Sequence, residues 1–200
     1  MNWLAHLFLS QPDGKHRLGN LLGDLVKGKE RKLHSCFSEG IECHLKIDYF
    51  TDHHLVFKRS KRRISIEHRR YSSVLIDVFY DHFLARNWDD YSSVSLAAFT
   101  EDVYNSFSEY WDVIPAFPRM VIYRMREQDW LGSYYYLDGV EATLRRIRRK
   151  LSVKYRDSFL VDAFLEELEV NYVELESDFQ EFFPEIVCYL SQSRKGAEYF

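Results

Sequence analysis

The stretch SFLVDAFLEELEVNYVELESDFQEFF, residues 158–183, indicates the fold class more clearly than any other segment of this chain. Its apolar residues recur every three or four positions, at Val161, Phe164, Leu165, Leu168, Tyr172, Leu175, Phe179 and Phe182. Such spacing gathers them on one face of an α-helix and leaves an acidic face opposite. We therefore predict one long amphipathic helix over this stretch.

The rest of the chain has the same periodicity. Steps of three and four mark further segments at residues 16–27, 40–60, 67–86, 94–113, 116–129 and 134–152. Glycine and proline are scarce, with eight and four residues, and most of them fall between these segments. A chain of 200 residues, 46% of them hydrophobic, suits one core better than two. The sequence predicts an all-α, single-domain helical bundle over residues 1–200.

Cysteine spacing and hydropathy bear on the compartment. Cys36, Cys43 and Cys188 show no CxxC spacing, which favours reduced thiols in the cytoplasm. The N-terminal MNWLAHLFLS has no basic leader, and no later segment approaches about 18 uninterrupted apolar residues. We expect a soluble cytoplasmic protein with no membrane partner.

Charge is segregated along the chain. The net charge of -4 argues against a general nucleic-acid binder. Residues 58–70 nevertheless carry seven Lys or Arg against one Glu, and a second basic cluster spans 145–150. Residues 162–185 hold nine acids and no base. Each run is either a solvated helix face or a docking surface, and the basic ones would suit an acidic partner.

Three apolar stretches each carry two polar, chemistry-bearing side chains four residues apart. The pairs are Asn20/Asp24, His44/Asp48 and Asp77/Asp81. Four residues is just over one helical turn, so each pair projects from one face, and its apolar neighbours suggest that the face is partly buried. Buried carboxylates need an ion pair, a hydrogen-bond network or a bound cation.

His44, Asp48 and Asp52 extend one of these pairs into a stripe at i, i+4 and i+8. Carboxylate oxygens suit hard divalent cations such as Mg²⁺ and Mn²⁺. A neighbouring imidazole shifts the preference toward Mn²⁺ or another first-row metal. The stripe therefore predicts a divalent-metal site, with Mn²⁺ as the first expectation.

Several of these residues also have structural interpretations. An internal ion pair to an arginine explains Asp77 as well as a site role does, whereas we favour Asp81 as a ligand. His82 is either a general acid, a partner of a ligand or a core histidine, and His6 alone would ordinarily be a core histidine. Helix capping or packing accounts for Asn20 without any chemistry.

The quoted motifs together resemble one family. MNWLAHLFLS, GNLLGDLVKG, GI..H..IDYFTDHH and Y....IDVFYDHFLARNW, within residues 1–90, resemble the acyl carrier protein phosphodiesterase family in order and spacing. The resemblance implies a helical fold similar to HD-domain phosphohydrolases and a divalent cation, typically Mn²⁺. It also implies a substrate, holo acyl carrier protein, from which 4′-phosphopantetheine is removed.

Several of the polar residues match family positions. Metal ligands are expected at Asp24, His44, Asp48 and Asp81. Catalytic groups are expected at His6, Asp52 and His82. Substrate or partner contacts are expected at Asn20 and Lys46 and, from the basic run, at Arg59, Arg62 and Arg63. The chain departs from the family at Leu45, where the family often has Arg. Two other functions stay open: a nucleotide or small-phosphodiester hydrolase, and a non-catalytic module that binds carrier protein.

Overall fold

A computed structural model describes residues 2–26 and 35–197, and every regular element in these ranges is a helix. None of these helices is both long and apolar enough to cross a membrane. The α-helices are α1 (Trp3–Phe8), α2 (Gly14–Leu25), α4 (Ser38–His53), α5 (Leu55–Arg63), α6 (Ser72–Arg86), α7 (Leu96–Ser106), α8 (Ala116–Glu127), α9 (Trp130–Ser133), α10 (Leu137–Lys150), α11 (Val153–Arg156), α12 (Val161–Val170) and α13 (Tyr172–Ala197). Short 3₁₀ helices cover Ser35–Phe37, Arg69–Tyr71, Trp88–Asp90 and Ser108–Val113.

The all-α prediction is confirmed, but some predicted helices are divided. The segment 94–113 forms α7 and the 3₁₀ helix Ser108–Val113, and two other segments break at polar residues. The segment 40–60 breaks at His54, whose extended backbone ends α4 and whose ring accepts a hydrogen bond from the N–H of Val56 in α5. The segment 158–183 breaks at Asn171, whose side-chain amide donates to the carbonyl oxygen of Glu167. Polar side chains that bond to backbone groups at a helix end compete with continuation of the helix.

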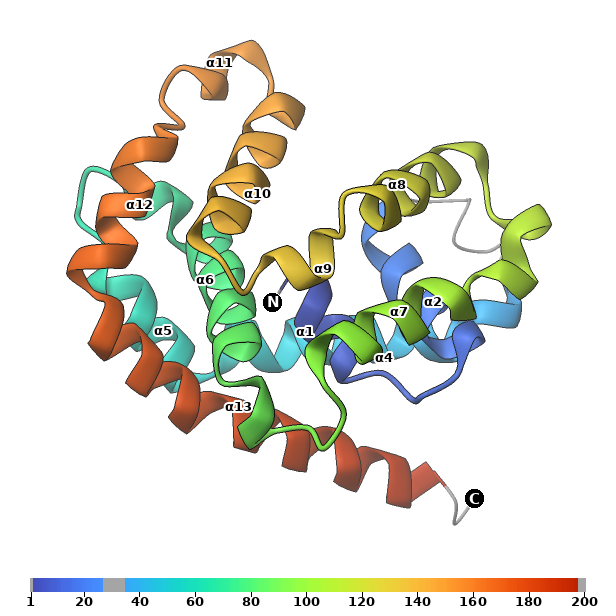
Figure 1. The fold of residues 1–200 in the computed structure, drawn as a ribbon. Coiled ribbons are helices and arrows are strands. Elements are labelled where there is room, and N and C mark those ends of the chain that lie inside the picture. The colour runs from blue at the N-terminus through green and yellow to red at the C-terminus, as the bar shows by residue number, and fades with distance from the viewer. Residues whose placement is uncertain (1, 27–34, 198–200) are drawn as a thin grey trace.

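Helix α6 is the centre of the bundle. Helices α1, α5, α10 and α13 pack around it, and α13 runs along the base (Figure 1). Its residues from Leu75 to Ala85 are nearly all buried, which explains its apolar sequence. The buried apolar side chains of the described residues form one cluster from Leu4 to Leu190. That is the arrangement expected of a single domain.

Helices α2 and α4 pack closely through glycines. A Cβ atom on Gly19 would collide with the carbonyl oxygen of Phe37, and one on Gly23 would lie 2.6 Å from Cγ of His44. The missing side chain of Gly23 therefore lets the His44 ring lie directly against α2. This contact brings the polar pairs of α2 and α4 to the same place in the fold.

Candidate functional site

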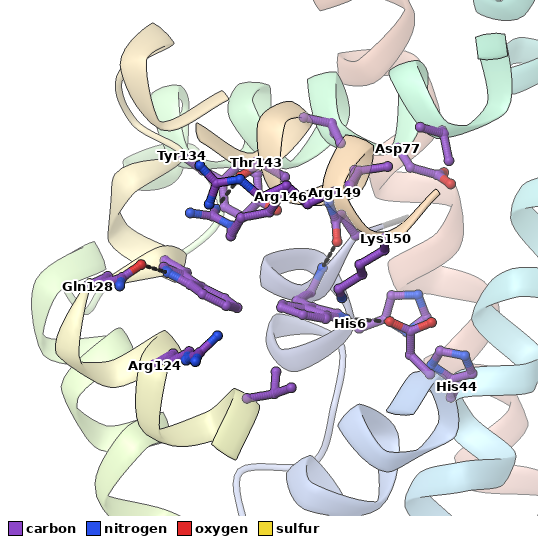
Figure 2. A pocket seen from close by; sticks show the side chains of 18 of the residues that line it. His6, His44, Asp77, Arg124, Gln128, Tyr134, Thr143, Arg146, Arg149 and Lys150 are labelled. Atoms are coloured by element: carbon purple, nitrogen blue, oxygen red, sulfur yellow. Dashed lines mark hydrogen bonds between the residues drawn. The ribbon is translucent and has the colours of Figure 1, made fainter. Parts of the chain in front are cut away.

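A cavity of about 600 Å³ lies between the N-terminal helices and α8–α10. His6 and His44 line one side of it, and Arg124 and Gln128 lie on the opposite side (Figure 2). The chemistry-bearing lining residues are Trp3, His6, Asp24, His44, Asp48, Asp77, Arg124, Trp130, Tyr134, Arg146, Arg149 and Lys150. The pocket therefore brings imidazoles and carboxylates together with guanidinium and ammonium groups.

Asp48 joins two histidines. Its Oδ1 lies 3.3 Å from Nε2 of His6, and its Oδ2 lies 3.1 Å from Nε2 of His44. The two imidazole rings are 4.5 Å apart between centroids. Burial alone would raise the pKa of Asp48, but the hydrogen bonds to both rings outweigh it and hold the pKa well below its usual range. Asp48 is therefore a carboxylate, with an imidazole at each oxygen.

Asn20 determines which nitrogen of His6 carries the proton. Its amide nitrogen donates to the carbonyl oxygen of His6 and to Oγ of Ser10, each at 2.9 Å. The amide oxygen must then face Nδ1 of His6, 2.8 Å away, and accept a hydrogen bond from it. With the proton on Nδ1, Nε2 of a neutral His6 has a free lone pair. That lone pair points at Oδ1 of Asp48.

Two lone pairs that face each other need a cation between them. A proton on Nε2 of His6 would serve, but burial lowers the pKa of His6 and opposes the imidazolium form. A metal ion would serve equally, and a set of imidazole nitrogens and carboxylate oxygens suits a first-row divalent cation. The donor chemistry therefore fits the metal that the sequence predicts.

The side chains are not assembled into a finished metal site. Among the described residues, no three His, Cys, Asp or Glu side chains are arranged so that they could hold a metal ion. Nε2 of His6 and Nε2 of His44 face different oxygens of Asp48 instead of converging on one point. Nδ1 of His44 is buried and has no hydrogen-bond partner in the described part of the chain.

Asp24 and Asp77 complete the acidic side of the pocket. Asp24 is exposed at the end of α2, and its Oδ2 accepts a hydrogen bond of 2.7 Å from the indole of Trp3. Asp77 is half-buried on α6. An ion pair and a site role explained Asp77 equally well from the sequence, and the structure places it in the pocket wall.

The pocket lining also includes Arg146, Arg149 and Lys150, which the site prediction missed and which we call the cationic wall. Arg146 lies over the ring of Trp130 at 4.3 Å, and Lys150 lies over the ring of Trp3 at 5.2 Å. The two indoles stack on each other with centroids 5.8 Å apart. The basic cluster at 145–150 was the available signal, but nothing in the sequence placed it in the same pocket as His6.

Asp81 and His82 lie outside the pocket lining and have structural partners. Asp81 is fully buried and accepts hydrogen bonds from the backbone N–H groups of Leu4, at 2.8 Å, and Ala5, at 3.2 Å. Burial raises the pKa of Asp81 to about 7, although both N–H groups act against that shift. His82 donates through Nδ1 to the carbonyl oxygen of Tyr134 at 2.7 Å. Asp81 therefore anchors α1, and His82 behaves as a satisfied core histidine.

The remaining predicted residues also lie away from the cavity. Asp52 is exposed on α4, and Lys46 pairs with Glu42 at 2.8 Å on the same helix. No residue of the basic run 58–70 lines the cavity. Arg59 and Arg63 bind Asp178 of α13 at 2.8 and 2.7 Å, so their charge serves the packing of α5 on α13.

The chain is similar to known proteins over nearly its whole length. Residues 1–186 match the family described as acyl carrier protein phosphodiesterase. A protein of that name from Serratia proteamaculans is 32% identical over 190 residues, which cover 94% of this chain and 96% of the relative. Another of that name, from Yersinia enterocolitica, is 32% identical over 187 residues, covering 92% and 94% of the two chains. A third from Photorhabdus laumondii is 28% identical over 203 residues, covering 100% and 98%.

No solved structure matches the chain. The similarity to HD-domain phosphohydrolases therefore stays a prediction from sequence.

Proposed function

The chain belongs to the acyl carrier protein phosphodiesterase family, a family of hydrolases, and we propose that it cleaves holo acyl carrier protein. The bond broken is the phosphodiester between 4′-phosphopantetheine and a serine of the carrier protein, and the product is apo carrier protein. One observation carries this proposal: a single pocket is lined both by a His–Asp–His cluster and by guanidinium and ammonium groups. A phosphodiester needs both, because its oxygens carry charge and its phosphorus must meet an activated water.

The cationic wall is proposed to bind the phosphate. Arg146, Arg149 and Lys150 would donate hydrogen bonds to its non-bridging oxygens and stabilise the charge that increases in the transition state. Stacking under Arg146 and Lys150 fixes where these donors point. Apolar side chains of the same lining, among them Phe117, Met120 and Ile147, offer surface to the pantetheine arm.

The acidic side is proposed to hold a divalent cation through His6, His44 and Asp48, with Asp24 as a further donor. Mn²⁺ is the first expectation, ahead of Mg²⁺ or another first-row metal, because imidazole nitrogens are among the donors. When bound, such an ion supplies a water of lowered pKa. Asn20 would keep Nε2 of His6 free for it by holding the ring proton on Nδ1.

The net reaction adds water across the phosphorus–serine bond. Oxygen from water joins phosphorus, the serine oxygen leaves with a proton, and 4′-phosphopantetheine is released. Asp81, Asp52, His82 and Lys46 are left out of this proposal because none of them lines the cavity.

Mass spectrometry of holo carrier protein after incubation with the protein and Mn²⁺ tests the proposal. The expected product is apo carrier protein, formed only when both protein and metal are present. Release of product from nucleotides, with none from holo carrier protein, would favour the small-phosphodiester alternative. Binding of holo carrier protein without any product would favour the non-catalytic one.

A further inference from the structure

A second cavity, of about 350 Å³, is lined by four arginines. Arg145, Arg148 and Arg149 come from the last turns of α10, and Arg156 comes from α11. We refer to these four residues as the arginine surface. Arg149 lines this cavity and the reaction pocket, so the two are continuous at one side chain.

Most of the charge on the arginine surface is not neutralised within the described chain. Arg145 pairs with Glu141 and Asp162. Arg148 donates to the carbonyl oxygen of Arg156, and Arg156 donates to that of Leu151. Among the described residues, no carboxylate forms an ion pair with Arg148, Arg149 or Arg156. Gathering like charges without counterions is unfavourable, which makes the surface a ready site for an anionic partner.

The basic run at 58–70 compares poorly as a docking site. Asp178 and Glu181 of α13 neutralise Arg59, and Asp178 also binds Arg63. Asp178 is 1% exposed, so these ion pairs belong to the packing of two helices. No residue of this run lines the reaction pocket, whereas Arg149 does, so the partner contact predicted from the sequence of this run is better served by α10 and α11.

We propose that the arginine surface is where the acidic carrier protein docks. Carboxylates of the partner would pair with Arg148, Arg149 and Arg156, and the continuity at Arg149 would lead the phosphopantetheine arm into the reaction pocket. Complementary charge of this kind speeds encounter and fixes orientation. The inference rests on the proposed function for the identity of the partner.

Binding of apo carrier protein tests the docking surface without any chemistry, because the apo form has no phosphodiester to cleave. We would measure its Kd by fluorescence anisotropy at low salt. The test variant is Arg148→Glu/Arg156→Glu. The matched control is Lys58→Glu/Arg62→Glu, which makes the same change of charge in the basic run on α5. A milder variant, Arg148→Gln/Arg156→Gln, guards against misfolding, and circular dichroism checks all three.

The test variant should raise Kd by about tenfold or more, the Gln variant by less, and the control by under about threefold. Added salt should weaken the binding of apo carrier protein to wild type more than its binding to the test variant. Equal Kd values for wild type and test variant, or a larger loss in the control, would overturn the proposal. Equally tight binding of a single-stranded oligonucleotide, lost in the same variant, would also overturn it, because the surface would then be a general polyanion site.

The binding test and the mass-spectrometry test can reject their two proposals separately. Loss of apo carrier protein binding in the test variant, with no product from wild type, keeps the docking surface and rejects the hydrolase. Product formation by wild type, with an unchanged Kd in the test variant, keeps the hydrolase and rejects the docking surface.

Discussion

The amide oxygen of Asn20 lies 2.8 Å from Nδ1 of His6, and this contact turns Nε2 of the ring toward Asp48 as a lone pair. Asn20 is fully buried and does not line the pocket. Its side chain bonds to His6 and so orients that ring, and the substrate or partner contact expected of it stays a prediction.

Replacing Asn20 by Leu should lower kcat by about 10–100-fold with little change in KM, because the ring of His6 would lose its fixed tautomer. Nitrogen NMR of the ring should show a proton on Nδ1 in wild type and a mixture in Asn20→Leu. Ser10→Ala is the control, since it removes the neighbouring contact of the same amide and leaves Nδ1 bonded. A wild-type ring protonated on Nε2 would contradict this account.

Asp24 and Asp81 were both predicted as metal ligands, but their replacement by alanine should change the free energy of unfolding by different amounts. Asp81→Ala should lower the free energy of unfolding by about 2 kcal/mol or more, because two buried N–H groups of α1 lose their acceptor. Asp24→Ala, at an exposed position, should change it by less than about 0.5 kcal/mol. Urea unfolding measures both.

Two carboxylates of the proposed metal site should be needed for activity. Asp24→Ala and Asp48→Ala should each abolish turnover, while their circular dichroism spectra stay the same as that of wild type. A fully active Asp48→Ala would remove this residue from the site, and an unfolded one would make it structural.

Chelation should stop the reaction reversibly. The proposed donors are carboxylates and imidazoles, which exchange a divalent ion more readily than thiolates exchange zinc. EDTA followed by dialysis should leave an inactive, folded protein, and Mn²⁺ should restore turnover. Undiminished hydrolysis by a sample that elemental analysis shows to be metal-free would contradict the metal requirement.

The hydrogen bonds and ion pairs of Asp178 should make the free energy of unfolding depend on pH. Burial alone would raise the pKa of Asp178, but the bonds from Arg63, Ser60 and Arg59 outweigh it and lower the pKa. Because the folded pKa lies below the unfolded value of about 3.9, these bonds stabilise the fold above that pH and are lost on acidification through the folded pKa.

Asp178→Asn should therefore destabilise the protein by about 1–3 kcal/mol at pH 7. The difference from wild type should shrink as the pH falls below about 4. Thermal melts across this range measure it, and a difference that grows on acidification would rule out the proposed cause.

The sequence alone determined the fold class and the polar pairs. Periodicity of three and four residues predicts a helix from local geometry, since each residue advances the chain by a fixed rise and turn. The pairing of His44 with Asp48 was predictable for this reason, and the structure joins them at 3.1 Å. The breaks at His54 and Asn171 escaped prediction because the apolar spacing continues across them.

Only the tertiary structure decided which pairs meet. Asp77 and Asp81 differ by about 6 Å along α6, yet one lines the pocket while the other lies beneath α1. The polar pairs of α2 and α4 come together because Gly19 and Gly23 let these two helices pack closely. The cationic wall comes from residues about a hundred positions farther along the chain. Helix geometry fixes neighbours within a turn, whereas contacts between distant helices depend on how their apolar faces pack.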